Sequence, residues 1–275
     1  MGAGNHQNVV DAYFHDRADH WKSVYETQES LAAVKYQARM AAILEIVAGL
    51  ECAGPRRVVE VGCGSGRVSA ALAGTGHEVH AVDRVPAMLQ EARRFAFERR
   101  LANKVRVVRG DVTRLPYPAG AFDLTIAIGV IPWLEVPRDG MRELARVTRR
   151  GGYVLVAIDN LWRLNNVIDP CSFAPLQPLR HGLRRGLQAL GLLAPVSVRC
   201  AMYTLREVED MVASAGLSKV KVSTVAFGPF TFMRIPLITQ KASIRLSRRL
   251  QNLANQGVSP FRYLGCDHIV LARRP

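Results

Sequence analysis

The sequence predicts an α/β protein with a doubly wound, mostly parallel sheet. Short runs of apolar and β-branched residues recur along the chain, they are apolar throughout rather than alternating, and helical segments separate them. Strands of that kind are buried on both faces, which is typical of a parallel sheet covered by helices. With 275 residues, 49% of them hydrophobic, the chain is long enough to bury such a core.

The elements follow in order along the chain. Two helices are expected within residues 8–50, where apolar residues keep a helical spacing. Pro86 suits the first turn of one later helix, and Thr204 with Glu207 forms the pattern of a capping box in another. A turn at Gly151 and Gly152 is expected before the fifth strand. The predicted strands are 57–61, 78–82, 105–108, 122–128, 153–158, 219–227 and 267–272, and the helices between them are 68–73, 86–100, 138–148 and 204–215.

A glycine-rich turn follows the first strand. Residues 58–66 read Val-Val-Glu-Val-Gly-Cys-Gly-Ser-Gly. Glycines there let the backbone approach a ligand, and the following helix offers free N–H groups. The third glycine comes one residue earlier than in the dinucleotide-binding G-x-G-x-x-G pattern. Asp83 and Asp111 follow the next two strands, where they can accept from the two ribose hydroxyls and from an adenine amino group. The three strand ends therefore predict one nucleoside-shaped cleft.

These motifs resemble those of class I S-adenosylmethionine-dependent methyltransferases. The resemblance covers about residues 55–160. Tyr13-Phe14, Trp21 and Tyr25, which precede a long helix, look like the N-terminal pattern of the small-molecule and lipid members, such as the quinone-pathway methyltransferases. The matching segments are Glu60–Gly66, Asp83, Gly110-Asp111-Val112, Phe122-Asp123, Glu143–Val147 and Arg150-Gly151-Gly152.

The resemblance implies a Rossmann-like sheet of seven strands and a site for S-adenosylmethionine, with S-adenosylhomocysteine as the product. Asp83 would hold the ribose. Asp111 and Val112 would hold the adenine, and Arg84 and Met88 would flank it. Ile128 and Gly129 would lie beneath the sulfonium. No set of metal ligands is expected. The cofactor-binding residues are thus Glu60, Gly62, Cys63, Gly64, Gly66, Asp83, Arg84, Met88, Asp111, Val112, Ile128 and Gly129.

The chain is expected to divide into a cofactor core with helical additions. Residues 1–54 would cover the cofactor site, and residues 55–160 would form the core, which continues at 204–227 and ends with the strand in 263–275. Two irregular stretches, 161–203 and 228–262, begin at carboxyl ends of parallel strands. Since ligands bind at that edge of an open sheet, both stretches are expected to form a cap over the acceptor.

The methyl acceptor is expected to be small, apolar or amphiphilic, and anionic, with O- or C-methylation favoured. Ile131-Pro132-Trp133 lacks the Asn/Asp-Pro-Pro-aromatic motif of amino-methylating nucleic-acid enzymes in the family. A hydroxyl acceptor would need a general base within hydrogen-bond reach. The candidate bases are His15, His20 and Tyr25, besides Asp11, and the candidate acceptor contacts are Trp133, Trp162, His181 and Arg234.

The net charge of +14 is concentrated in the two irregular stretches, which carry +4 within 160–203 and +6 within 228–262. An apolar run at 230–238 precedes a helix with an apolar and a basic face, which fits either a lid or contact with an anionic membrane.

Methylation of a lipid-linked or glycan intermediate at the membrane stays open as an alternative. RNA methylation is disfavoured because aliphatic rather than aromatic residues interleave the basic ones. The remaining functional alternative is a non-catalytic binding protein with the same fold.

The location expected from the sequence is cytoplasmic, with peripheral membrane contact open. The N-terminus lacks the layout of a signal peptide, and no stretch is apolar enough to span a bilayer. The five cysteines are scattered, which predicts reduced thiols rather than a zinc site or a disulfide framework. The sequence leaves the oligomeric state open.

Overall fold

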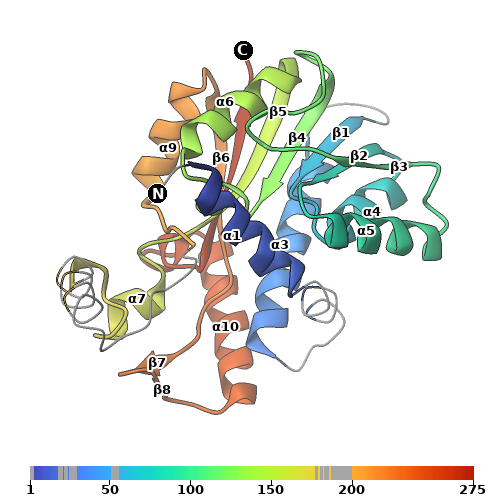
Figure 1. The fold of residues 1–275 in the computed structure, drawn as a ribbon. Helices are drawn as coiled ribbons and strands as arrows, with labels where there is room; N and C mark the ends of the chain where they lie inside the picture. The colour runs from blue at the N-terminus through green and yellow to red at the C-terminus, as the bar shows by residue number, and fades with distance from the viewer. Residues whose placement is uncertain are drawn as a thin grey trace.

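The computed structural model describes residues 3–17, 21, 24, 30–50, 56–176, 179, 182, 186 and 200–275. Among these, seven strands form one sheet in the order β3-β2-β1-β4-β5-β9-β6 (Figure 1). The strands pair in parallel except at β9, which runs antiparallel to β5 and β6. The predicted doubly wound, mostly parallel sheet is therefore confirmed. The strands are β1 Arg57–Val61, β2 Glu78–Asp83, β3 Val105–Arg109, β4 Phe122–Ile128, β5 Thr148–Asp159, β6 Ser218–Val225 and β9 Asp267–Arg273.

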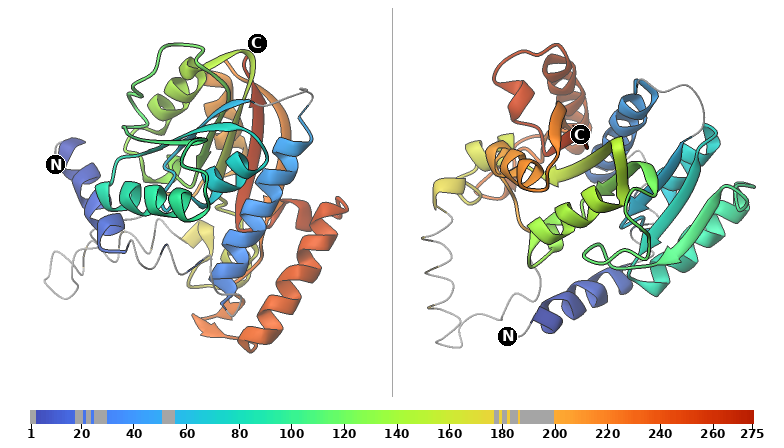
Figure 2. Two further views of the ribbon diagram at one scale, coloured as in Figure 1. Left: turned by 90° about the vertical axis from the view of Figure 1, so that its right-hand side faces the viewer. Right: turned by 90° about the horizontal axis from the view of Figure 1, so that it is seen from above.

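Helices cover both faces of the sheet (Figures 1 and 2). Consecutive side chains of a strand point to opposite faces. Val58 of β1 accordingly packs with Ile43 and Leu72, while Val59 packs with Met141 and Val212. On the first face lie α3 Leu31–Ala48, α4 Arg67–Gly74 and α5 Pro86–Glu98; on the second lie α6 Pro137–Val147 and α9 Leu205–Ser214.

Local signals set several element boundaries. Thr204 Oγ1 accepts from the backbone N–H of Glu207, whose carboxylate accepts from that of Thr204, so the capping box of α9 is confirmed. The expected turn at Gly151 and Gly152 is wrong, because both lie inside β5. Strand β5 starts directly after α6, and a register shift against β4 absorbs the extra residues.

The remaining elements flank the carboxyl edge of the sheet. Helix α10 packs Leu246, Leu250 and Leu253 against the cluster around Phe227 and leaves its basic side chains exposed. The predicted two-faced helix is confirmed. No helix among the described residues is long and apolar enough to cross a membrane. These elements are α1 Ala3–His15, α7 Leu164–Ile168, β7 Thr231–Phe232, β8 Ile235–Pro236, α10 Gln240–Asn255 and the 3₁₀ helices Ile131–Trp133, Ala174–Leu176 and Phe261–Tyr263.

Candidate active site

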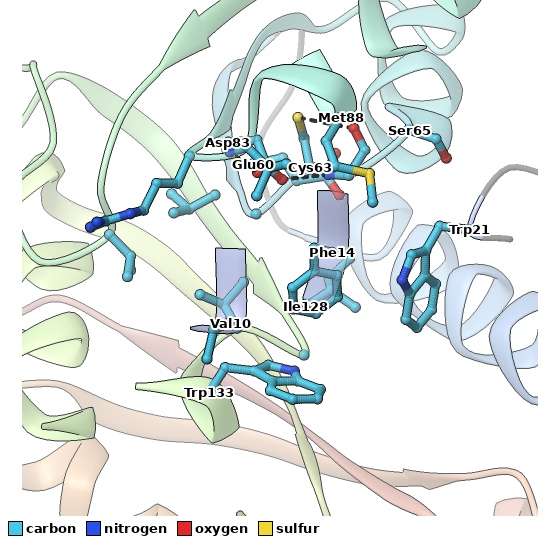
Figure 3. A pocket seen from close by; sticks show the side chains of 18 of the residues that line it. Val10, Phe14, Trp21, Glu60, Cys63, Ser65, Asp83, Met88, Ile128 and Trp133 are labelled. Atoms are coloured by element: carbon cyan, nitrogen blue, oxygen red, sulfur yellow. Dashed lines mark hydrogen bonds between the residues drawn. The ribbon is translucent and has the colours of Figure 1, made fainter. Parts of the chain in front are cut away.

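A cavity of about 410 Å³ opens at the carboxyl ends of β1, β2, β4 and β5. Figure 3 shows Val10 and Phe14 beside Trp133, across the cavity from Glu60 and Asp83. Helix α1 therefore lines the cavity together with the sheet edge. The lining residues from the strand ends and loops include Glu60, Gly62, Cys63, Gly64, Asp83, Arg84, Met88, Asp111, Val112, Ile128, Gly129 and Trp133.

The glycine-rich turn is held by its own backbone and by Asp83. The N–H of Gly64 donates to Asp83 Oδ2 at 2.9 Å, and the N–H of Cys63 donates to the carbonyl of Val82 at 3.0 Å. Gly62 and Gly64 have φ of +69° and +51°, in the left-handed region that favours glycine. A Cβ on Gly62 would lie 2.2 Å from Val130 Cγ2, whereas a Cβ on Gly64 would meet nothing within 4 Å.

The two glycines therefore have separable roles. Gly62→Ala should lower the free energy of unfolding by about 2–3 kcal/mol, because the methyl group clashes with Val130 and the backbone is strained. Gly64→Ala should cost only about 1 kcal/mol, from strain alone, yet weaken binding of S-adenosylhomocysteine because its Cβ enters open space. Urea unfolding and calorimetry measure the two effects. Equal stability losses with unchanged binding would contradict this assignment.

Asp83 and Asp111 lie at the ends of neighbouring strands. The N–H of Val85 donates to Asp83 Oδ1 at 2.9 Å, and burial raises the pKa of the Asp83 carboxyl. Arg84 lies between two carboxylates, donating from Nε to Asp11 Oδ2 at 2.7 Å and from its other end to Asp111. Burial acts to raise the pKa of Asp111, but hydrogen bonds from Thr113 and the nearby Arg84 outweigh it and lower the pKa. Asp111 is therefore ionised and fixed in place.

Glu60 is buried directly beneath the glycine-rich turn. Burial raises the pKa of its carboxyl to about 8. Ser69 Oγ donates to Glu60 Oε2 at 2.5 Å from the first turns of α4. Glu60 thus ties the end of β1 to the following helix and is mainly protonated at neutral pH.

An aromatic wall closes the other end of the cavity. The rings of Phe14 and Trp133 lie 5.1 Å apart at 77°, and those of Tyr13 and Trp133 lie 5.5 Å apart. Trp21 extends the wall toward Tyr36, with 5.2 Å between ring centroids. This end of the cavity is apolar on the side formed by α1.

A largely buried charged cluster beside Tyr36 is formed by Lys35, Arg39, Asp159 and Asp267. Lys35 Nζ is 2.7 Å from Asp267 Oδ1 and 3.2 Å from Asp159 Oδ1, and Arg39 is 3.4 Å from Asp267 Oδ2. Lys35, Arg39 and Asp159 line the cavity. Burial acts to lower the pKa of Lys35, but Asp267 and Asp159 outweigh it and raise the pKa well above its usual value.

The sequence patterns did not predict this charged cluster. The long helix was recognised by its apolar stripe, and nothing in that stripe marks Lys35 or Arg39 as internal. Asp159 ends β5. The criterion that singled out Asp83 and Asp111, an acid at the carboxyl end of a parallel strand, applies equally to Asp159 and would have found it.

Several expected site residues lie elsewhere. His15 is exposed on α1 and does not line the cavity. Trp162, 40% exposed, and Arg234, in an exposed hairpin turn, also lie outside the lining, contrary to expectation. Gly66 packs against Ala92 of α5 instead of facing the cavity. His20, Tyr25 and His181 lie outside the described residues.

The second irregular stretch does not form the expected cap over the cavity. None of residues 228–262 lines it, because α10 packs against α3 and β6 instead. Of the first stretch, Cys200 lines the cavity, with Sγ 3.5 Å from Asp159 Oδ2. Among the described residues, no group of three or more His, Cys, Asp or Glu side chains is arranged to hold a metal ion.

Known proteins resemble the chain in sequence and in fold. It is 41% identical over 105 residues to malonyl-[acyl-carrier protein] O-methyltransferase of Halorhodospira halophila, covering 38% of this chain and 35% of that protein. It is 39% identical over 103 residues to demethylmenaquinone methyltransferase of Clavibacter sepedonicus, covering 36% and 40%. The chain thus spans less than half the length of these two relatives.

The fold also resembles that of a solved methyltransferase. The structure of magnesium protoporphyrin IX methyltransferase from Synechocystis PCC 6803 superposes with a TM-score of 0.64 at 16% identity, covering 98% of this chain and 100% of that chain. Residues 59–156 match the family described as a methyltransferase domain. The matched residues include the end of β1, the glycine-rich turn, Asp83 and Asp111, all of which contribute to the cavity lining. The chain therefore carries a methyltransferase domain of the class I, S-adenosylmethionine-dependent type.

Proposed function

We propose that the protein transfers a methyl group from S-adenosylmethionine to an oxygen of a small, apolar or amphiphilic acceptor that carries a carboxylate. The observation that carries the proposal is one continuous cavity, lined by Asp83 and Asp111 at one end and by Trp133 and Lys35 at the other. Its volume of about 410 Å³ lies within the usual range for small-molecule sites.

The residues at the first end suit the cofactor. The open space at Gly64 leaves room for a ligand against the backbone. Asp83 and Asp111 present carboxylate oxygens, which accept hydrogen bonds from hydroxyl and amino groups such as those of a nucleoside. S-adenosylmethionine, when bound, supplies an electrophilic methyl group on sulfur. The protein's part in such a transfer is largely positioning.

The protonation states of the lining residues favour an acceptor atom that is already ionised. Burial raises the pKa of Tyr36 and of Cys200, so both keep their protons at neutral pH. Although burial acts to raise the pKa of Asp159, Lys35 and Arg39 lower it, which makes Asp159 a weak base. None of the described lining residues is a histidine. A carboxylate oxygen needs no proton removed before it attacks.

The second end of the cavity suits an acceptor with an apolar part and an anionic group. Phe14 and Trp133 offer ring faces to the apolar part. Lys35 and Arg39, which also pair with Asp159 and Asp267, line the cavity and are the cations that would attract the anion. The name of the Halorhodospira relative, an O-methyltransferase of malonyl-[acyl-carrier protein], supports an oxygen acceptor. The name of the Clavibacter relative, a demethylmenaquinone methyltransferase, supports an apolar quinone-type acceptor as the second candidate.

The test measures binding of the cofactor product and identifies the methylated acceptor. Calorimetry with S-adenosylhomocysteine should show one site per chain. Incubation with deuterated-methyl S-adenosylmethionine and a panel of malonyl thioesters and demethylated quinols should label one acceptor class, detected by mass spectrometry. A label lost under mild alkali identifies a methyl ester, and fragmentation of a product with a stable label distinguishes a methyl ether from C-methylation. Absence of cofactor binding would refute the proposed function, and a stable label would refute the carboxylate acceptor alone.

A further inference from the structure

A two-stranded hairpin, β7–β8, carries a tight turn made of residues that rarely form one. Phe232 pairs with Ile235, so Met233 and Arg234 form the two-residue loop. Both have positive φ, 51° and 65°. Such turns are dominated by Asn and Gly, because other residues are strained in that region. A methionine and an arginine at these strained positions indicate that their side chains have a role that outweighs the backbone preference for Asn or Gly in the turn.

The base of the hairpin is firmly anchored. The N–H and the Oγ1 of Thr231 donate to Asn165 Oδ1 at 3.1 and 3.0 Å, and the N–H of Arg234 donates to Asp169 Oδ2 at 3.1 Å. Asn165 and Asp169 are 5% and 0% exposed. Buried polar groups that bind the hairpin backbone hold it in one position. The tip is therefore presented by a rigid support.

The tip exposes large apolar side chains. Phe232 is 50% exposed and Ile235 68% exposed. Contiguous apolar exposure of this kind marks interaction sites in soluble domains. The other exposed apolar side chains of the hairpin and its flank are Met233 and Leu237.

The surroundings of the tip are strongly basic. Residues 228–262 contain six Lys or Arg and no Asp or Glu. On α10, Lys241, Arg245, Arg248 and Arg249 are exposed. Figure 1 and the left view of Figure 2 place the hairpin and much of α10 at the end of the molecule opposite the C-terminus. Apolar groups and cations thus gather at the same end.

We propose that the β7–β8 hairpin and the exposed basic face of α10 dock the protein on an anionic lipid bilayer. Helix α10 itself does not insert, because its apolar face is already packed around Phe227 and Leu250. The hairpin tip instead enters the interfacial region, and the cations of α10 lie over the anionic headgroups. Phosphate and carboxylate headgroups complement the surplus positive charge, and fluid acyl chains accommodate a narrow apolar tip. The docking surface lies outside the cavity, so the proposal stands independently of the proposed function.

Vesicle flotation tests the proposal. The protein should float with vesicles of 70% phosphatidylcholine and 30% phosphatidylglycerol, and not with phosphatidylcholine alone. Phe232→Ser with Ile235→Ser should lower the vesicle affinity about tenfold through lost apolar burial. Arg245→Glu, Arg248→Glu and Arg249→Glu together should lower it roughly a hundredfold through lost headgroup attraction.

Matched controls separate docking from general effects. Phe97 is 75% exposed on α5, so Phe97→Ser removes one exposed aromatic side chain elsewhere on the surface. Arg99, Arg138 and Arg150 are exposed outside the hairpin and α10, and their triple reversal to Glu matches the charge change. The Phe97 variant should float like the wild type, and the control triple should lose far less affinity than the α10 triple. Circular dichroism melting verifies the fold of each variant.

Either of two flotation results would overturn the proposal. One is wild-type protein that does not float with anionic vesicles, which would point to an acidic protein as the partner. The other is hairpin variants that float like the wild type. Hydrogen exchange on unmodified protein gives an independent readout: vesicles should protect residues 231–238, and unchanged exchange there would also refute docking.

Discussion

Asp83→Ala should weaken binding of S-adenosylhomocysteine about a hundredfold. A hydrogen bond to a charged group contributes roughly 1.5–3 kcal/mol, and the carboxylate of Asp83 is the acceptor proposed for two ribose hydroxyls. The carboxylate also accepts from the N–H groups of Gly64 and Val85, so its loss frees the glycine-rich turn. Isothermal titration calorimetry measures the dissociation constant, and methyl transfer at low cofactor concentration should fall in parallel.

A matched control distinguishes this effect from a general loss of charge. Asp139 lies on α6, is half-exposed and pairs with Arg142 at 3.0 Å, away from the cavity. Asp139→Ala should leave binding unchanged. If Asp83→Ala bound the cofactor product within twofold of the wild type, the ribose assignment of Asp83 would be refuted while the fold assignment stood.

The cofactor end of the site could be predicted from sequence for a physical reason. In a parallel sheet, every residue that follows a strand reaches the same edge, so reading strand ends in order locates Gly62, Asp83, Asp111 and Gly129 together. The structure places all four in the lining of one cavity. Periodicity likewise predicted the buried face of α10, but not that of α3, where Ala41 of the predicted stripe is exposed and Ile43 and Ile46 are buried instead.

The acceptor end depends on contacts that no local pattern encodes. Lys35 meets Asp159 and Asp267 across 124 and 232 positions of the chain. Nor does composition show whether a basic stretch faces a ligand or solvent. The arginines of α10 were expected over the acceptor, but the apolar face of α10 packs around Phe227 and Phe261, which leaves the arginines exposed. The hairpin was expected only as an apolar run, because two-residue strands are too short for periodicity to reveal.

The cluster of Lys35, Arg39, Asp159 and Asp267 should contribute strongly to the free energy of unfolding. Lys35→Met should lower the free energy of unfolding by about 3–5 kcal/mol, because it leaves the carboxylates of Asp267 and Asp159 facing each other with Arg39 alone. Asp267 has a side chain only 1% exposed, so water cannot compensate for the lost cation. Urea unfolding at pH 8 measures the loss. Lys219→Met is the matched control: Lys219 pairs with Glu209 at 2.6 Å but is 48% exposed, so its removal should cost less than about 1 kcal/mol.

The loss should also depend on pH, with a definite sign. Burial raises the pKa of Asp267 even in the intact cluster, where Lys35 opposes the rise. Without Lys35, the pKa of Asp267 in the folded state moves further above its unfolded value, so between the two values the folded protein binds a proton that the unfolded chain does not. Stability then falls as pH rises through that window. The deficit of Lys35→Met should therefore be larger at pH 8 than at pH 5, and Asp267→Asn added to Lys35→Met should restore part of it at pH 8. Equal deficits at both pH values, or no restoration by Asp267→Asn, would show that Lys35 acts through packing of its aliphatic stem rather than through its charge.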